Sequence, residues 1–63
     1  MKNKTRQSLR SAIRAIAAYP YPDSIRAAAH QRWANAMRKF LGGDVVEAYT
    51  ISQSIIYDLG ERR

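Results

Sequence analysis

Residues 22–44 read PDSIRAAAHQRWANAMRKFLGGD, a helical pattern of apolar residues between a proline and a pair of glycines. The apolar positions are Ile25, Ala29, Trp33, Ala36, Met37, Phe40 and Leu41. Their spacing of three and four residues places them along one face of an α-helix. Pro22 suits the first position of a helix, Asp23 suits an N-cap, and glycine commonly follows a helix end. The segment therefore predicts a helix over about 23–41.

The residues before this segment carry a second helical pattern. Its apolar positions are Leu9, Ala12, Ile13, Ile16 and Ala17. They predict a helix over about 5–18, with Asn3 or Thr5 as its cap. The helix has to end near Tyr19, because a residue that precedes proline is pushed out of the α region. The two prolines of the connector make it stiff, and we expect its two tyrosines to pack on the helices.

The residues after the glycines predict a third helix. Asp44-Val45-Val46-Glu47 resembles a capping box, with Asp in place of the usual Ser or Thr. Apolar or small residues follow at positions 45, 48, 52, 55 and 59 on one face, and at 46, 49, 51, 56 and 57 around its side. So many β-branched residues would also suit a strand, but the capping box and the spacing favour a helix over about 45–59. Gly60 would end it, and residues 1–4 and 60–63 are expected to fray.

These segments predict an all-α fold, in which residues 1–63 form a single domain built as a compact three-helix bundle. A chain this short buries only about 60% of the surface that its unfolded form exposes. With no cysteine and one histidine, neither a disulfide nor a structural zinc site can reinforce it. Because the third helix is apolar on more than one side, we expect a homodimer or a larger partner. The predicted shared core of a dimer is Trp33, Met37, Phe40, Ile55 and Ile56.

The charge of the chain, which is +6 overall, is unevenly distributed. Residues 1–22 hold five cationic side chains and no acid, whereas four of the five acids lie in residues 44–63. Arg6, Arg10 and Arg14 recur every four residues and form a stripe on the first helix. Such a stripe either keeps the protein in solution or contacts phosphates or an acidic protein surface.

No group of residues in the sequence has the pattern of a catalytic or cofactor site. His30 has no carboxylate three or four positions away to orient it, and Asp44 and Glu47 are explained by helix capping. A glycine-rich phosphate loop is absent, because the only glycine pair is followed by an acid. We therefore expect no enzymatic activity, no cofactor, no metal and no small-molecule substrate.

Two further classes are disfavoured by the sequence. A helix-turn-helix would use the third helix for recognition, but residues 45–59 hold no Lys or Arg to contact DNA. No apolar run approaches the roughly 20 residues of a membrane span, and the N-terminus lacks the apolar block of a signal peptide. These features lead us to expect a cytoplasmic protein that does not bind membranes.

The chain resembles the small early proteins encoded in the exo–xis region of phage lambda and other lambdoid phages. The resemblance is carried by AAYPYPDSIR at residues 17–26, Trp33, YTISQSIIYDLGERR at residues 49–63 and the total length of 63 residues. It implies a compact, non-enzymatic protein associated with the choice between lysis and lysogeny and with effects on the host cell. It implies no particular functional residues.

The preferred hypothesis is a helical phage accessory protein that dimerises and binds a host or phage protein in the host cytoplasm. In this hypothesis Arg6, Arg10 and Arg14 form the contact face. The alternative is a nucleic-acid-binding protein that uses the basic first helix, whose affinity would fall steeply with salt.

Overall fold

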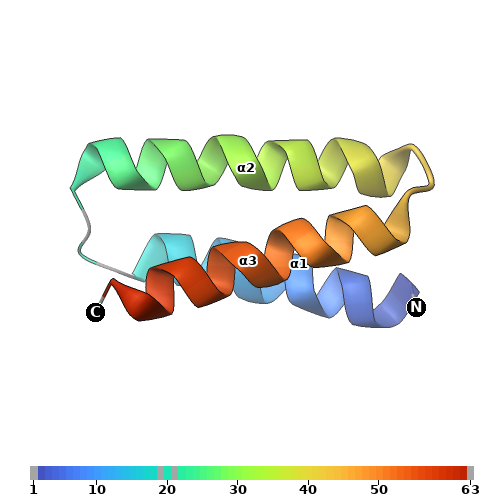
Figure 1. Ribbon diagram of the computed structural model, residues 1–63, viewed down its shortest axis with the longest axis horizontal. Coiled ribbons are helices and arrows are strands. Elements are labelled where there is room, and N and C mark those ends of the chain that lie inside the picture. The colour runs from blue at the N-terminus through green and yellow to red at the C-terminus, as the bar shows by residue number, and fades with distance from the viewer. Residues whose placement is uncertain (1, 19, 21, 63) are drawn as a thin grey trace.

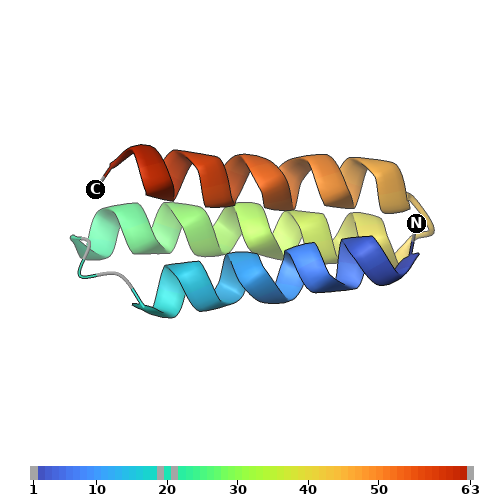
Figure 2. The ribbon, with the colours of Figure 1, turned by 90° about the horizontal axis from the view of Figure 1, so that it is seen from below.

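The computed structural model describes residues 2–18, 20 and 22–62, which fold into three α-helices with no strand (Figure 1). The helices are α1 (Lys2–Ala18), α2 (Asp23–Leu41) and α3 (Val45–Glu61). α2 runs in the opposite direction to α1 and α3, which run parallel to each other (Figures 1 and 2). The bundle measures 32 × 17 × 15 Å. The prediction of an all-α three-helix bundle is confirmed.

The bounds predicted for α2 are confirmed, but its first turn is built differently from the prediction. Pro22 is the N-cap, because its ψ of 146° is extended, and Asp23 is the first helical residue. The carbonyl of Pro22 accepts hydrogen bonds from the amides of Ile25 (3.0 Å) and Arg26 (3.2 Å). The Asp23 carboxylate makes no capping hydrogen bond but lies 4.0 Å from Arg26 Nη1. Its charge suits the positive end of the helix dipole.

The glycine pair ends α2 as predicted. The amide of Gly42 donates to the carbonyl of Arg38 at 2.9 Å, and Gly43 has a φ of +93°. This left-handed conformation favours glycine, because a Cβ would clash with the backbone there. The Asp44 Oδ1 then accepts a hydrogen bond from the amide of Glu47 at 3.1 Å, which confirms the predicted N-cap of α3.

The outer helices are longer than predicted. Residues 2–4 belong to α1 and residues 60–61 to α3, while residues 1 and 63 lie outside the described residues. Thr5 is not a cap but a buried residue of α1, and its hydroxyl donates to the carbonyl of Val45 at 3.2 Å. This bond ties the first turns of α1 and α3 together. At the other end, Arg62 Nε lies 3.3 Å from Asp58 Oδ2 and closes the last turn of α3 beyond Gly60.

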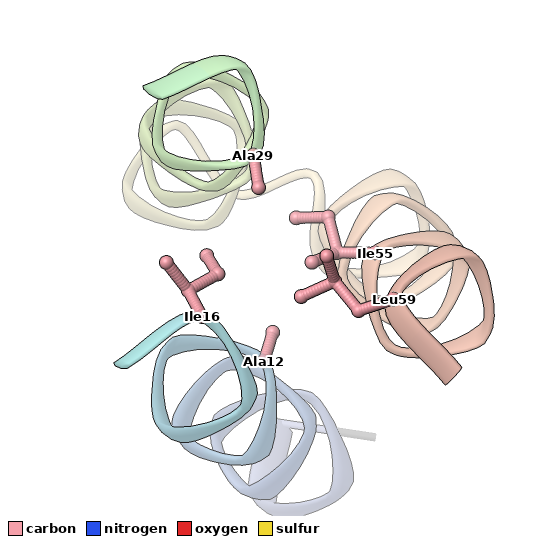
Figure 3. Packing of buried hydrophobic residues seen from close by; sticks show 5 residues of the cluster. All are labelled: Ala12, Ile16, Ala29, Ile55 and Leu59. Carbon is pink, nitrogen blue, oxygen red and sulfur yellow. The ribbon is translucent and has the colours of Figure 1, made fainter. Parts of the chain in front are cut away.

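The apolar core lies where the three helices meet at the end of the bundle that holds the C-terminus (Figures 1 and 3). Figure 3 shows its side chains converging from all three helices; they are Ala12, Ile16, Ala29, Ile55 and Leu59. Each of the five is at most 5% exposed. The predicted packing of Tyr19 and Tyr21 lies outside the described residues.

The seam between α1 and α3 is lined by small and polar side chains nearer the start of both helices. Ser8 and Ser52 are buried and share a hydrogen bond between their hydroxyls. Gln53 Nε2 donates to Ser8 Oγ at 2.9 Å, and Ser52 Oγ donates to the carbonyl of Tyr49 at 2.9 Å. Small side chains let two helices approach closely, and these hydrogen bonds satisfy the polar groups that the approach buries.

A mild truncation in the core tests this packing. Ile55→Val removes one methylene from a side chain that is 0% exposed, and such a change costs about 0.5–1.5 kcal/mol of stability. For a domain of this size, the melting temperature should fall by roughly 2–12 °C, as measured by circular dichroism. Val46→Ala is the control, because Val46 is 60% exposed and its truncation should change stability by less than about 0.5 kcal/mol. Equal melting temperatures for the two variants would contradict the assignment of Ile55 to the core.

Candidate functional site

The candidate site is a groove of about 300 Å³ between α1 and α2, which we call the α1–α2 groove. Its lining residues are Arg6, Leu9, Arg10, Ile13, Trp33, Met37 and Phe40. α3 packs extensively against both other helices, whereas α1 and α2 contact each other less. The large side chains of α2 that face α1 therefore remain only half-buried.

The floor of the groove is fixed by a hydrogen bond between the two helices. Trp33 Nε1 donates to the backbone carbonyl of Leu9 at 2.9 Å. Leu9 itself is 4% exposed, and the indole is half-buried above the core, against which it packs. A carbonyl has two lone pairs, so Leu9 can accept this bond besides one within its helix. The bond holds the indole ring in one orientation and links α2 directly to α1.

The rim of the groove on the α1 side is basic. Arg6 and Arg10 are exposed, and neither forms an ion pair within the described part of the chain. Arg14 is also exposed, but it does not line the groove. The reason is helical geometry: four residues advance the side chain by about 40° beyond a full turn, so the stripe winds away from α2. The structure thus separates the three arginines that the sequence grouped together.

The residues predicted to form a shared dimer core do not lie on one surface. Trp33, Met37 and Phe40 line the α1–α2 groove together. Ile55 is 0% exposed inside one chain, so it has no surface to offer a second chain. Ile56 is half-buried on α3 and packs against the core. The five residues therefore do not make the single shared patch that the sequence suggested.

The prediction that Leu41 belongs to the buried apolar stripe of α2 is wrong. Leu41 is 78% exposed and does not join the buried face. It lies four positions after Met37, so the two are neighbours on the surface of α2, one turn apart. Leu41 does not line the α1–α2 groove, because four residues turn the side chain about 40° further around the helix, as they do for Arg14 on α1.

The opposite groove, between α2 and α3, differs in its charge. It has a volume of about 240 Å³, and Arg32, Asp58 and Arg62 are among its lining residues. Arg32 Nη1 lies 3.6 Å from Asp58 Oδ2, and Arg62 Nε lies 3.3 Å from the same oxygen. Arg32 also donates to the hydroxyl of Ser54. The cationic groups here already have acidic partners, whereas the two arginines of the α1–α2 groove have none among the residues that the structure describes.

A metal-binding cluster and a membrane-spanning helix are both absent from the residues that the structure describes. Among those described, no group of three or more His, Cys, Asp or Glu side chains is placed to hold a metal ion, and His30 is exposed. The described helices include none that is long and apolar enough to cross a membrane.

Sequence reasoning missed the part that α1 contributes to the floor of the groove. Leu9 and Ile13 were assigned to the core face of that helix, and Ile13 is only half-buried. Their spacing from Arg6 and Arg10 is the signal that could have placed all four on adjoining faces of one helix.

Comparison of the chain with models of known protein families, with curated proteins and with solved structures gave no match.

Removal of the indole donor tests the floor of the groove. Trp33→Phe deletes the hydrogen bond to Leu9 and some packing, which should lower the free energy of unfolding by about 1–2 kcal/mol. Met37→Leu is the matched variant, because it changes a half-buried apolar residue of the same groove with nearly constant volume and no hydrogen bond. Urea titrations followed by circular dichroism measure both. If Trp33→Phe is no more destabilising than Met37→Leu, the bond does not hold the two helices together.

Proposed function

We propose that this protein acts by binding another protein in the α1–α2 groove, without catalysing a reaction. The proposal is carried by the half-buried Trp33, Met37 and Phe40, which line the same groove as two basic residues. These are Arg6 and Arg10, which form no ion pair within the described part of the chain. Tryptophan and arginine are the residues in which protein interfaces concentrate binding energy, and methionine and phenylalanine are also enriched there.

The shape of the site supports a macromolecular partner. The groove is an open strip along two helices, in which apolar side chains lie beside charged ones. A partner would remove the half-buried apolar surface from water, which is the main source of affinity, while the arginines would orient it. The α2–α3 groove supports this function less, because its charges are already paired.

The biological setting of the proposal comes from the sequence. The resemblance to small early proteins of lambdoid phages suggests a partner that takes part in the choice between lysis and lysogeny or in host physiology. The partner would then be a host or phage protein of the host cytoplasm. The alternative function, binding of nucleic acid, would use the same basic helix but not the apolar floor.

Affinity capture from a nuclease-treated bacterial lysate tests the proposed function. Arg10→Glu places an acid at the rim of the groove, whereas Arg14→Glu makes the same change of charge on the same helix outside the groove. We expect the original protein and Arg14→Glu to retain a common protein that Arg10→Glu loses, as read by mass spectrometry of the eluates.

Two outcomes would contradict the proposal. In the first, no captured protein distinguishes Arg10→Glu from Arg14→Glu. In the second, capture occurs only before nuclease treatment and both variants weaken it, which would favour the alternative function.

A further inference from the structure

We infer that the partner enters the α1–α2 groove as an acidic amphipathic helix. This inference rests on the proposed function and adds the chemistry of the occupant. The apolar residues of that helix would lie on the groove floor, and its carboxylates would face Arg6 and Arg10.

The length of the groove matches two turns of a helix. Its lining runs from Arg6 to Ile13 on α1 and from Trp33 to Phe40 on α2. Seven residues of α-helix rise by about 10 Å, so both walls have this length. Helices that dock in apolar grooves use anchors at positions i, i+3 or i+4, and i+7, which cover the same distance.

The side chains that line the groove also suit a helical occupant. Ile13, Met37 and Phe40 are half-buried and leave apolar surface open between the helices. Methionine is flexible and adapts to the shape of a bound side chain.

The charge of the rim selects an acidic partner. Arg6 and Arg10 are four residues apart, so their Cβ atoms are separated by about 5–6 Å. Glutamates four residues apart on a partner helix have the same spacing, and each can accept charge-assisted hydrogen bonds from a guanidinium group. No acidic residue is among the residues that line the groove, so no lining carboxylate competes with those of such a partner.

A second copy of this chain fits the groove less well. A twofold dimer through this groove would bring Arg6 and Arg10 of both copies together, because a symmetric interface uses the same patch twice. Among the described residues, the other exposed large apolar side chains are Val46 and Tyr57 on α3, at 60% and 71% exposure. They are about 16 Å apart along the helix, which exceeds the length of the groove. The observations therefore favour a different protein as the source of the helix.

Fluorescence of Trp33 gives a direct test, because it is the only tryptophan of the chain and lines the groove. The probe is a synthetic amphipathic helical peptide without tryptophan, with leucines at i, i+4 and i+7 and glutamates along one edge. We expect it to shift the Trp33 emission to shorter wavelength and to saturate at micromolar concentrations. A peptide of the same composition in scrambled order, which has no apolar face, should give no saturable shift.

The arginine variants locate the binding. Arg10→Glu should weaken binding of the acidic peptide by roughly tenfold or more, and Arg14→Glu by less than about twofold. A peptide with lysines in place of the glutamates should bind Arg10→Glu more tightly than the original protein. This reversal depends on charge at the groove and would not follow from a loss of folding.

Four results would overturn the inference, of which the first three concern the peptide and the arginine variants. They are the absence of any emission change up to about millimolar acidic peptide, equal weakening by Arg10→Glu and Arg14→Glu, and displacement of the peptide by a short single-stranded oligonucleotide at low salt. The fourth is a dimer, measured by light scattering, that the peptide dissociates, because this result would assign the groove to a second copy of the chain.

The two experiments together distinguish failure of this inference from failure of the proposed function. If the peptide does not bind while a lysate protein still depends on Arg10, only the helical acidic partner is wrong. If the peptide binds while no lysate protein depends on Arg10, the proposed function fails.

Discussion

The close approach of α1 and α3 is the constraint on which the rest of the structure depends. Ser8 and Ser52 are small enough to let the two helices meet, and their shared hydrogen bond satisfies the hydroxyls that the contact buries. Thr5 fixes the register by donating to the carbonyl of Val45. α2 packs against α3 as extensively as α1 does but contacts α1 less, and its large side chains on the α1 side are only half-buried. The α1–α2 groove is the consequence of this unequal packing.

The same packing determines which charges remain available. Asp58 on α3 lies beside Arg32 and Arg62, Asp23 lies beside Arg26, and Asp44 caps α3. Each of these acids is therefore engaged within α2 and α3 or at their ends. Among the described residues, Arg6 and Arg10 form no ion pair, so the rim places positive charge next to apolar surface. Charge of this kind guides an oppositely charged partner and determines its orientation more than it adds to affinity.

Much of the fold could be predicted from the sequence, because local signals determine it. The glycine pair after Leu41 and the Asp44 cap give sharp helix ends, since each follows from backbone chemistry within a few residues. The outer ends of α1 and α3 were predicted too short, because long-range contacts stabilise them, such as the hydrogen bond from Thr5 to a residue 40 positions away. The roles predicted for Pro22 and Asp23 were interchanged, because Pro22 is the N-cap and Asp23 the first helical residue. The two positions are adjacent, and helix ends are defined only to within one or two residues.

The candidate site was only partly predictable for a related reason. Periodicity identifies a helix face, but it cannot say which neighbour covers that face. Trp33, Met37 and Phe40 were recognised as one set, as were Arg6 and Arg10, yet their meeting across two helices depends on tertiary packing. Ile55 was placed at an interface because α3 is rich in apolar residues, although one chain already buries it completely.

The occupant that we propose for the α1–α2 groove, an acidic amphipathic helix, would contact both walls of the groove. The most direct measurement is the change in backbone amide chemical shifts of the labelled protein when the acidic peptide is added to saturation. The account predicts that the shifts concentrate in residues 6–13 and 33–41, with the outer face of α3 around Tyr57 unchanged. Shifts that cluster on α3, or that spread evenly along all basic residues, would contradict it.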